Sequence, residues 1–206
     1  MTKIAFYDFD DTLLPRDSMA RLIIYCLKKK PWLFYYLFSI LFFSILYVLK
    51  FISFKPLKQQ ILFPLNYLSE EELKEFYRTV LIPCYYENVV SSLYKHHEEG
   101  YLIFLVSASP EAYLKYTDLP VDVIIGTQMA YEHGHYTNKM ISLNCKSEEK
   151  VRRIYEVLKN RNLEIDYENS YGYSDSFTDL PMLRLVKNRI RIEKGTGKMT
   201  CFEIDD

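Results

Sequence analysis

The sequence predicts an α/β protein with a doubly wound parallel sheet and an inserted helical cap, and two observations carry this prediction. Short apolar stretches typical of buried strands alternate with helical segments over most of the 206 residues. A long helical stretch near the start interrupts the alternation, which is typical of an inserted unit. The predicted domains are an α/β catalytic core of residues 1–14 and 85–206 and a helical cap of residues 15–84.

The first strand is predicted at residues 4–7, which are apolar and rich in strand-forming side chains. It ends abruptly in Asp8, Asp10 and Asp11, followed by Thr12. A buried parallel strand that ends in carboxylates opens into the crevice where such sheets bind ligands. Because these carboxylates repel one another, a bound cation is the simplest explanation for the cluster. The alternative is an acidic turn after an edge strand.

Capping residues and apolar patterning predict the helical segments of the first half of the chain. Their approximate ranges are 18–27, 31–49, 69–78 and 85–99. Asp17 or Ser18 caps the first segment. Ser69 and Glu72 form a capping box for the third, and Gly100 ends the fourth.

Strand-like stretches return in the second half of the chain. The predicted strands are residues 101–106, 121–125, 169–173 and 189–193, and the predicted helices are residues 111–116, 147–160 and 180–186. Residues 128–141 alternate around Gly134, which predicts a β-hairpin. Strands that alternate with helices in this way predict a parallel sheet.

The composition excludes several classes of protein. A hydrophobic fraction of 49% and a charged fraction of 26% suit a globular protein, and the net charge of -1 argues against a general nucleic-acid binder. The cysteines are widely spread and form no CxxC pair, which predicts reduced thiols in a cytoplasmic protein. We expect no signal peptide, because strand-like residues begin at once.

Polar side chains follow three predicted strands where each strand ends: Asp8 and Asp10, Ser107, and Asp175 and Asp179. Because these ends converge at one edge of a doubly wound sheet, we expect the side chains to meet there. Their chemistry suits phosphoryl transfer. One carboxylate attacks phosphorus, and a second protonates the leaving oxygen and later deprotonates water. A hydroxyl and a lysine hold the phosphoryl oxygens, and further carboxylates hold Mg²⁺.

The segments DFDDT and SDSFTD, with Ser107 and a helix-start lysine between them, resemble the motifs of the haloacid dehalogenase superfamily in order and spacing. The resemblance covers the whole chain and implies the Rossmann-like fold of that superfamily. It implies that Asp8 is the nucleophile and that Asp10 is the acid/base, whose backbone carbonyl also binds Mg²⁺. An aspartate at position 10 marks a phosphatase, since ion-pumping relatives have threonine there.

The same resemblance implies roles for the other motif residues. Thr12 stabilises the turn, and Ser107 binds the phosphoryl group. Asp175 binds Mg²⁺, and Asp179 supports its coordination. Ser174 stands where many members have glycine, which changes the freedom of the turn but removes no ligand. The predicted metal residues are therefore Asp8, Asp10, Asp175 and Asp179.

The phosphate-binding lysine is Lys146 or Lys150, which share one face of a helix. The stretch around them resembles a subfamily pattern, Gly-x-x-Lys, with Ser147 in place of glycine. That pattern favours Lys150. Lys146 is then an ordinary solvated charge.

Residues 31–49 carry no charge and as a helix are about 28 Å long, close to the ~30 Å of a bilayer core. A single crossing would separate Asp8 from Ser107 and Asp175, which must share one soluble site. The run is therefore expected to be a re-entrant hairpin, an interfacial helix, a buried pair of helices in the cap or a dimer interface.

The flanks of this run favour membrane contact. Aromatic residues such as Trp32 suit the membrane interface. Lysines on both sides are expected to attract anionic lipid headgroups. These lysines are Lys28, Lys29, Lys30, Lys50, Lys55 and Lys58. The predicted location is cytoplasmic, peripheral or monotopic at the inner face of the membrane.

The predicted function is a Mg²⁺-dependent phosphatase that works through an aspartyl phosphate. Its motifs and its basic–apolar–basic cap resemble the subfamily that contains phosphatidylglycerophosphatase C, which implies a lipid phosphate such as phosphatidylglycerophosphate. Phosphoserine phosphatases have similar motifs and a more polar cap, so a small soluble phosphomonoester is the alternative. An inactive binding module on the same fold is a third possibility, which the complete set of acidic residues disfavours. The oligomeric state stays open.

Overall fold

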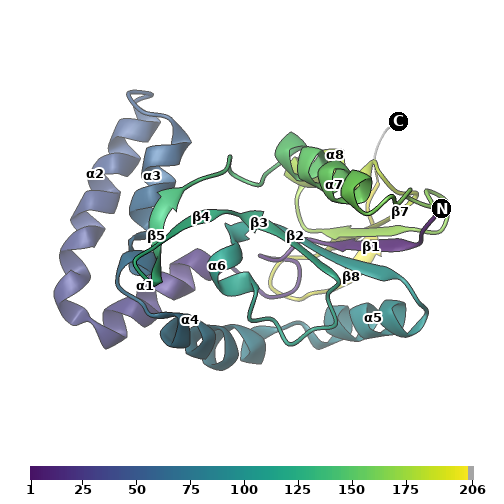
Figure 1. Cartoon of the computed structure of the whole chain (residues 1–206), viewed down its shortest axis with the longest axis horizontal. Helices are drawn as coiled ribbons and strands as arrows, with labels where there is room; N and C mark the ends of the chain where they lie inside the picture. The colour runs from purple at the N-terminus through teal and green to yellow at the C-terminus, as the bar shows by residue number, and fades with distance from the viewer. Residues whose placement is uncertain (204–206) are drawn as a thin grey trace.

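The computed structural model, which describes residues 1–203, has a six-stranded sheet at its centre in the order β3-β2-β1-β6-β7-β8 (Figure 1). All neighbouring strands in it are parallel except β7 and β8. The strands are β1 (Ile4–Tyr7), β2 (Leu102–Pro110), β3 (Val123–Thr127), β6 (Tyr171–Ser174), β7 (Asn188–Ile192) and β8 (Met199–Cys201). The predicted α/β fold with a parallel sheet is confirmed.

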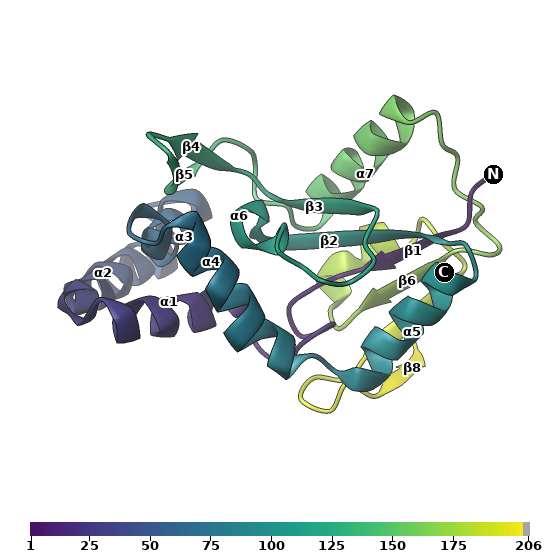
Figure 2. The ribbon, with the colours of Figure 1, turned by 60° about the horizontal axis from the view of Figure 1, so that its bottom comes forward.

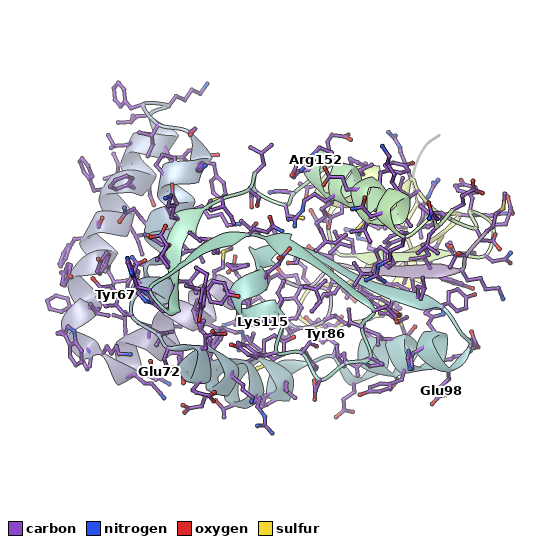
Figure 3. All side chains as sticks on the ribbon, in the orientation of Figure 1. Tyr67, Glu72, Tyr86, Glu98, Lys115 and Arg152 are labelled. Atoms are coloured by element: carbon purple, nitrogen blue, oxygen red, sulfur yellow. The ribbon has the colours of Figure 1, made fainter. Side chains whose placement is uncertain are left out.

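Helices cover both faces of the sheet, as a doubly wound fold requires (Figures 1 and 2). Helix α5 (Glu87–Glu98) lies on one face, and α7 (Glu148–Asn160) and α8 (Leu180–Leu183) lie on the other. Glu98 of α5 and Arg152 of α7 accordingly lie on opposite sides of the sheet in Figure 3. Strand β1 is buried on both faces, which explains its continuous apolar sequence.

Four helices form the part of the molecule that lies beyond the edge of the sheet (Figures 1 and 2). They are α1 (Ser18–Lys29), α2 (Tyr36–Val48), α3 (Phe54–Ile61) and α4 (Glu70–Phe76). Asp17 caps α1 through its side chain, and Ser69 and Glu72 form the predicted capping box of α4. Short 3₁₀ or π turns join these elements at Pro31–Tyr35, Phe63–Asn66, Tyr77–Leu81 and Ile82–Cys84.

A hairpin of β4 (Met129–Glu132) and β5 (His135–Met140) leaves the central sheet and packs against these helices. The side chain of Asn138 donates to the carbonyl of Gln59 at 2.8 Å. The backbone N–H of Asn138 donates to Asn66 Oδ1 at 2.8 Å. The helical segment is therefore fastened to the rest of the chain by the hairpin. The division into residues 15–84 and the remainder stays a prediction.

The structure differs from the predicted elements at several boundaries. Strand β2 continues to Pro110 and so includes Ser107. Helix α6 is limited to Glu111–Leu114, and α8 follows a 3₁₀ turn at Phe177–Asp179. The edge strand β8 lies outside the predicted strands, because its three residues are exposed and lack an apolar pattern. Ser147 makes no side-chain cap to α7.

Two expectations for the apolar run are wrong. Helix α2 is not a buried core of the cap, because none of its residues is buried and 6% of the stretch Pro31–Val48 lies inside the protein. This stretch is long and apolar enough to cross a membrane by length and composition. Lys58 does not lie near a surface where headgroups could bind, because only 1% of it is exposed.

Candidate active site

A cleft of about 230 Å³ opens where the carboxyl ends of β1, β2 and β6 meet. The order of the strands reverses at this point, since the chain moves from β1 to β2 and β3 and then returns to the other side of β1. All the predicted site residues line this cleft. They are Asp8, Asp10, Ser107, Lys150, Asp175 and Asp179.

Lys150 reaches the cleft from the first turn of α7 and is almost completely buried. Its Nζ lies 2.7 Å from Asp8 Oδ1 and 2.8 Å from Asp179 Oδ2. Burial opposes the charge on Lys150, but the two carboxylates outweigh burial and raise the pKa of the ammonium. Lys150 is therefore a fixed cation at the position where a phosphoryl group would meet Asp8.

The structure favours Lys150 over Lys146 as the phosphate ligand. Lys146 also lines the cleft, but it is exposed. Ser147, between them, has a φ of 53°, in the left-handed region that favours glycine. This backbone conformation explains why a glycine suits the position in the related sequence pattern.

Asp8 sits at the end of β1, and burial raises the pKa of its carboxyl while Lys150 opposes that rise. Its backbone N–H donates to the carbonyl of Tyr173, so the ends of β1 and β6 are held together. Thr12 lies within 3.5 Å of Asp8 Oδ2 and within 3.4 Å of Asp175 Oδ1 through its hydroxyl. The predicted turn residue therefore bridges the two carboxylates.

Asp10 has different surroundings from Asp8. Its Oδ1 accepts from the backbone N–H of Ser18 at 2.7 Å, and its Oδ2 accepts from Ser109 Oγ at 2.5 Å. Burial raises the pKa of Asp10 to about 6, although these hydrogen bonds oppose the rise. A carboxyl that titrates near neutral pH is suited to give and take a proton during catalysis.

Ser109 and Ser18 also belong to the surroundings of Asp10, and neither was predicted as a site residue. Ser109 Oγ lies 2.9 Å from Ser18 Oγ, which in turn lies 2.7 Å from the hydroxyl of Tyr113. These buried hydroxyls hold Asp10 in place. Ser109 is two residues after Ser107 on an extended strand, so the period of two could have placed both on one face. The sequence carries no comparable signal for Ser18.

The carboxylates of the cleft could supply only some of the ligands of a divalent cation. Within residues 1–203, no three acidic, histidine or cysteine side chains form a ready cluster for a metal ion. Asp8 and Asp175 do approach the same hydroxyl of Thr12, and the backbone carbonyl of Asp10 stays a predicted ligand. Mg²⁺ is commonly bound by one or two carboxylates while it keeps several waters, so these residues fit that ion.

Two lysines contact the predicted metal residues. Lys194 lies 2.9 Å from Asp175 Oδ2 and 3.4 Å from Asp11 Oδ2. Asp179 Oδ2 accepts from both Lys150 and Ser174 Oγ. These cations offset part of the negative charge, and Asp179 acts on the cleft through Lys150.

Residues 5–184 match the family of haloacid dehalogenase-like hydrolases. The chain belongs to this family. It is 31% identical over 137 residues to the histidinol-phosphatase of Neisseria meningitidis serogroup C (strain 8013). That match covers 63% of this chain and 62% of the relative, so the chain spans less than two thirds of that protein's length.

Solved structures share the fold of this hydrolase over nearly its whole length. A protein of unknown function from Bordetella pertussis Tohama I has a TM-score of 0.77 at 25% identity, covering 93% of this chain and 90% of its own. A substrate-bound phosphoserine phosphatase has a TM-score of 0.64 at 14% identity, covering 96% of this chain and 89% of its own. The predicted family and fold are therefore confirmed.

Proposed function

We propose that the protein is a Mg²⁺-dependent phosphatase that hydrolyses a phosphomonoester through an aspartyl phosphate on Asp8. The main support is the contrast between two nearby carboxylates. Asp8 faces the fixed ammonium of Lys150, whereas Asp10 is held by Ser109 and has its pKa raised to about 6. Two carboxylates in such different surroundings suit a nucleophile and an acid/base.

In this reaction an oxygen of Asp8 attacks phosphorus, and the bond from phosphorus to the leaving alcohol breaks. Asp10 gives its proton to the leaving oxygen. Asp10 then takes a proton from water, whose oxygen attacks the phosphoryl group, releases inorganic phosphate and restores Asp8. Ser107 and Lys150 hold the phosphoryl oxygens. A Mg²⁺ ion held by Asp8, Asp175 and the Asp10 carbonyl would neutralise charge between nucleophile and phosphate.

We further propose a lipid phosphate as the substrate, because the protein exposes a large apolar surface. We call it the apolar face. Its members are Trp32, Phe34, Phe38, Leu41, Phe42, Ile45 and Val48. Phe38 is 67% exposed and Val48 is 74% exposed. Contiguous apolar surface of this kind marks an interaction site, and a helix that is apolar all round must be buried in something.

Charge and position support a bilayer as the partner of the apolar face. Lys50, in the turn after α2, and Lys55, at the start of α3, are exposed and can meet anionic headgroups. Lys29 and Lys30 instead pair with Glu75 and Glu72. Figure 3 shows that Glu72, the partner of Lys30, lies at the end of the cap opposite the turn after α2.

The end of α2 that carries Val48 of the apolar face lies near the cleft. Tyr47 of α2 contacts Phe54 of α3, with ring centroids 5.7 Å apart, and Phe54 lines the cleft. A lipid phosphate could therefore reach Asp8 while its chains remain at the membrane. We propose accordingly that the protein works at the inner face of the membrane, from the cytoplasmic side.

The test compares Phe38→Glu/Phe42→Glu with wild type on vesicles that contain phosphatidylglycerol and phosphatidylglycerophosphate. Tyr155→Glu, at an exposed aromatic residue of α7, is the control. We expect the double variant to leave the vesicles and to lose activity on the lipid phosphate, but not on p-nitrophenyl phosphate. Unchanged vesicle binding would contradict the membrane proposal.

A small soluble phosphomonoester is the second candidate substrate. The relative named histidinol-phosphatase and the structural likeness to phosphoserine phosphatase favour it. A panel of soluble phosphomonoesters, assayed with and without vesicles, separates the two candidates. Higher kcat/KM on a soluble substrate than on the lipid, with no effect of vesicles, would favour this second candidate.

A further inference from the structure

Lys58 lies in α3 of the cap, yet its side chain ends inside the core. Only 1% of the residue is exposed. Its Nζ donates to the carbonyl of Ala108 at 2.6 Å and to Thr127 Oγ1 at 3.2 Å, and it also donates to Asn144 Oδ1. These acceptors come from the end of β2, the end of β3 and the loop before α7. One ammonium from the cap therefore joins three segments of the core.

The acceptors of Lys58 are all neutral. Within residues 1–203, no carboxylate lies within ion-pair distance of its Nζ. Burial lowers the pKa of Lys58 to about 8, although Cys145, Asp17 and Asp10 oppose the change; Lys146 adds to it. A buried cation without a counter-ion destabilises a fold, and an apolar side chain of similar volume would be tolerated at least as well. Its presence here calls for a role other than stability.

The carbonyl that Lys58 holds belongs to the residue between two serines of the site. The backbone N–H of Ser109 donates to Ser107 Oγ at 3.0 Å. Ser109 Oγ donates to Asp10 Oδ2 at 2.5 Å. A displacement of Ala108 would therefore move both the predicted phosphate ligand Ser107 and the carboxyl of Asp10.

The other acceptors lead to the opposite wall of the cleft. Thr127 Oγ1 donates to the Ala108 carbonyl at 2.6 Å and accepts from the backbone N–H of Cys145 at 3.2 Å. Asn144 and Cys145 lie in the loop that leads to α7, which carries Lys150. Lys58 thus contacts both segments that present phosphate-binding side chains.

We infer that Lys58 is a positioning residue that fastens the cap onto the core and holds Ser107, Asp10 and the segment before Lys150 in their working arrangement. The inference rests on the proposed roles of Asp10 and Ser107, but it does not depend on a lipid substrate. Lys58 also lines the cleft, and the inference assigns its effect to the contacts that it makes with Ala108, Thr127 and Asn144. Removal of Lys58 then loosens both the seat of the cap and the phosphoryl site.

The experiment measures Lys58→Met with Mg²⁺ and p-nitrophenyl phosphate. Methionine keeps the length and apolar stem but cannot bind the three acceptors. Lys74→Met, at an exposed lysine of the cap helix α4, is the matched control. We expect kcat to fall about 10²-fold in Lys58→Met, the scale of a small misplacement of catalytic groups. The melting temperature should stay the same or rise, and Lys74→Met should resemble wild type.

A merely structural role would give a different result, because activity and melting temperature would fall together. That outcome, or kcat within twofold of wild type, would overturn the inference. Asn144→Ala provides a second test from the core side of the same contact. The double variant Lys58→Met/Asn144→Ala should lose no more kcat than the more impaired single variant, because both changes break the same contact. Additive losses in the double variant would also overturn the inference.

The proposed function is judged separately in the same assay. Wild-type turnover of p-nitrophenyl phosphate that Asp8→Asn abolishes supports the reaction, whatever the result for Lys58. A wild type that is inactive on every phosphomonoester tested would contradict the proposed function. It would also contradict the inference on Lys58, because that inference rests on the proposed roles of Asp10 and Ser107.

Discussion

Lys150 Nζ lies 2.7 Å from Asp8 Oδ1, although the two residues are 142 positions apart in the chain. Both groups are buried, so their attraction is screened less than it would be in water. The contact places a permanent positive charge beside the predicted nucleophile. In the proposed reaction, Lys150 would first orient Asp8 and would then hold the phosphoryl oxygens.

Lys150→Ala should therefore lower kcat/KM strongly, whereas Lys146→Ala should change it little. The loss of comparable donors to a transition state costs about 3 to 4 kcal/mol, or roughly 10²- to 10³-fold in rate. Steady-state kinetics on p-nitrophenyl phosphate measures the difference. A larger loss in Lys146→Ala than in Lys150→Ala would show that the exposed lysine binds the phosphate.

Asp8→Asn should abolish turnover and leave the fold intact. An amide of the same shape cannot form the acyl phosphate. Mass spectrometry of the wild type, quenched during turnover, should detect a phosphorylated peptide that contains Asp8, and the variant should lack it. Activity of the variant within tenfold of wild type would exclude Asp8 as the nucleophile.

Asp10→Asn should slow turnover by about 10² to 10⁴, the usual contribution of an acid/base group. Its two oxygens accept from Ser18 and Ser109, so the amide can keep only part of this arrangement. A substrate with a very good leaving group needs less protonation and should be affected less. Equal losses for good and poor leaving groups would argue against Asp10 as the acid.

EDTA should remove activity, and added Mg²⁺ should restore it, because the groups near Asp8 and Asp175 are hard oxygen ligands. Asp175→Ala should raise the Mg²⁺ concentration needed for half-maximal activity. Titration of the chelated enzyme with Mg²⁺ gives this value directly. Full activity in excess EDTA would contradict the metal assignment.

The parts of the site that the sequence predicted are those with local signals. The acidic end of β1 follows a run of apolar residues, as does Ser107, which lies within β2. Asp175 directly follows β6. Such patterns are visible without tertiary structure because parallel strands end at a common edge. The registers and the six-stranded order then brought these residues to one cleft.

The parts that escaped prediction depend on contacts between distant segments. Lys58 belonged, by sequence, to a basic stretch after an apolar run. Only the bonds of its Nζ to Ala108 of β2 and Thr127 of β3 show that its side chain enters the core. Strand β8 is a strand because it pairs with β7, and its own residues carry no apolar pattern that would predict it. The membrane contact of α2 stays a prediction, because exposure alone does not identify a partner.

The burial of Lys58 has a consequence for stability that can be measured. In the folded protein burial lowers its pKa to about 8, whereas in the unfolded chain a lysine titrates near 10.5. Between these values the unfolded chain binds more protons, so this group makes the free energy of unfolding rise as pH increases. Below about pH 8 the full destabilisation is present. One pH unit between the two pKa values corresponds to about 1.4 kcal/mol, so the destabilisation is on the order of 3 kcal/mol.

Lys58→Met removes this dependence. The advantage in free energy of unfolding that we expect for Lys58→Met over wild type should be largest at pH 7 and should shrink toward pH 10. Other groups that titrate in this range cancel in the comparison. Urea unfolding at several pH values measures it, and Lys74→Met, where the lysine is exposed, should show no such trend. A difference between Lys58→Met and wild type that is constant from pH 7 to pH 10 would mean that Lys58 keeps an ordinary pKa and that its ammonium is not desolvated.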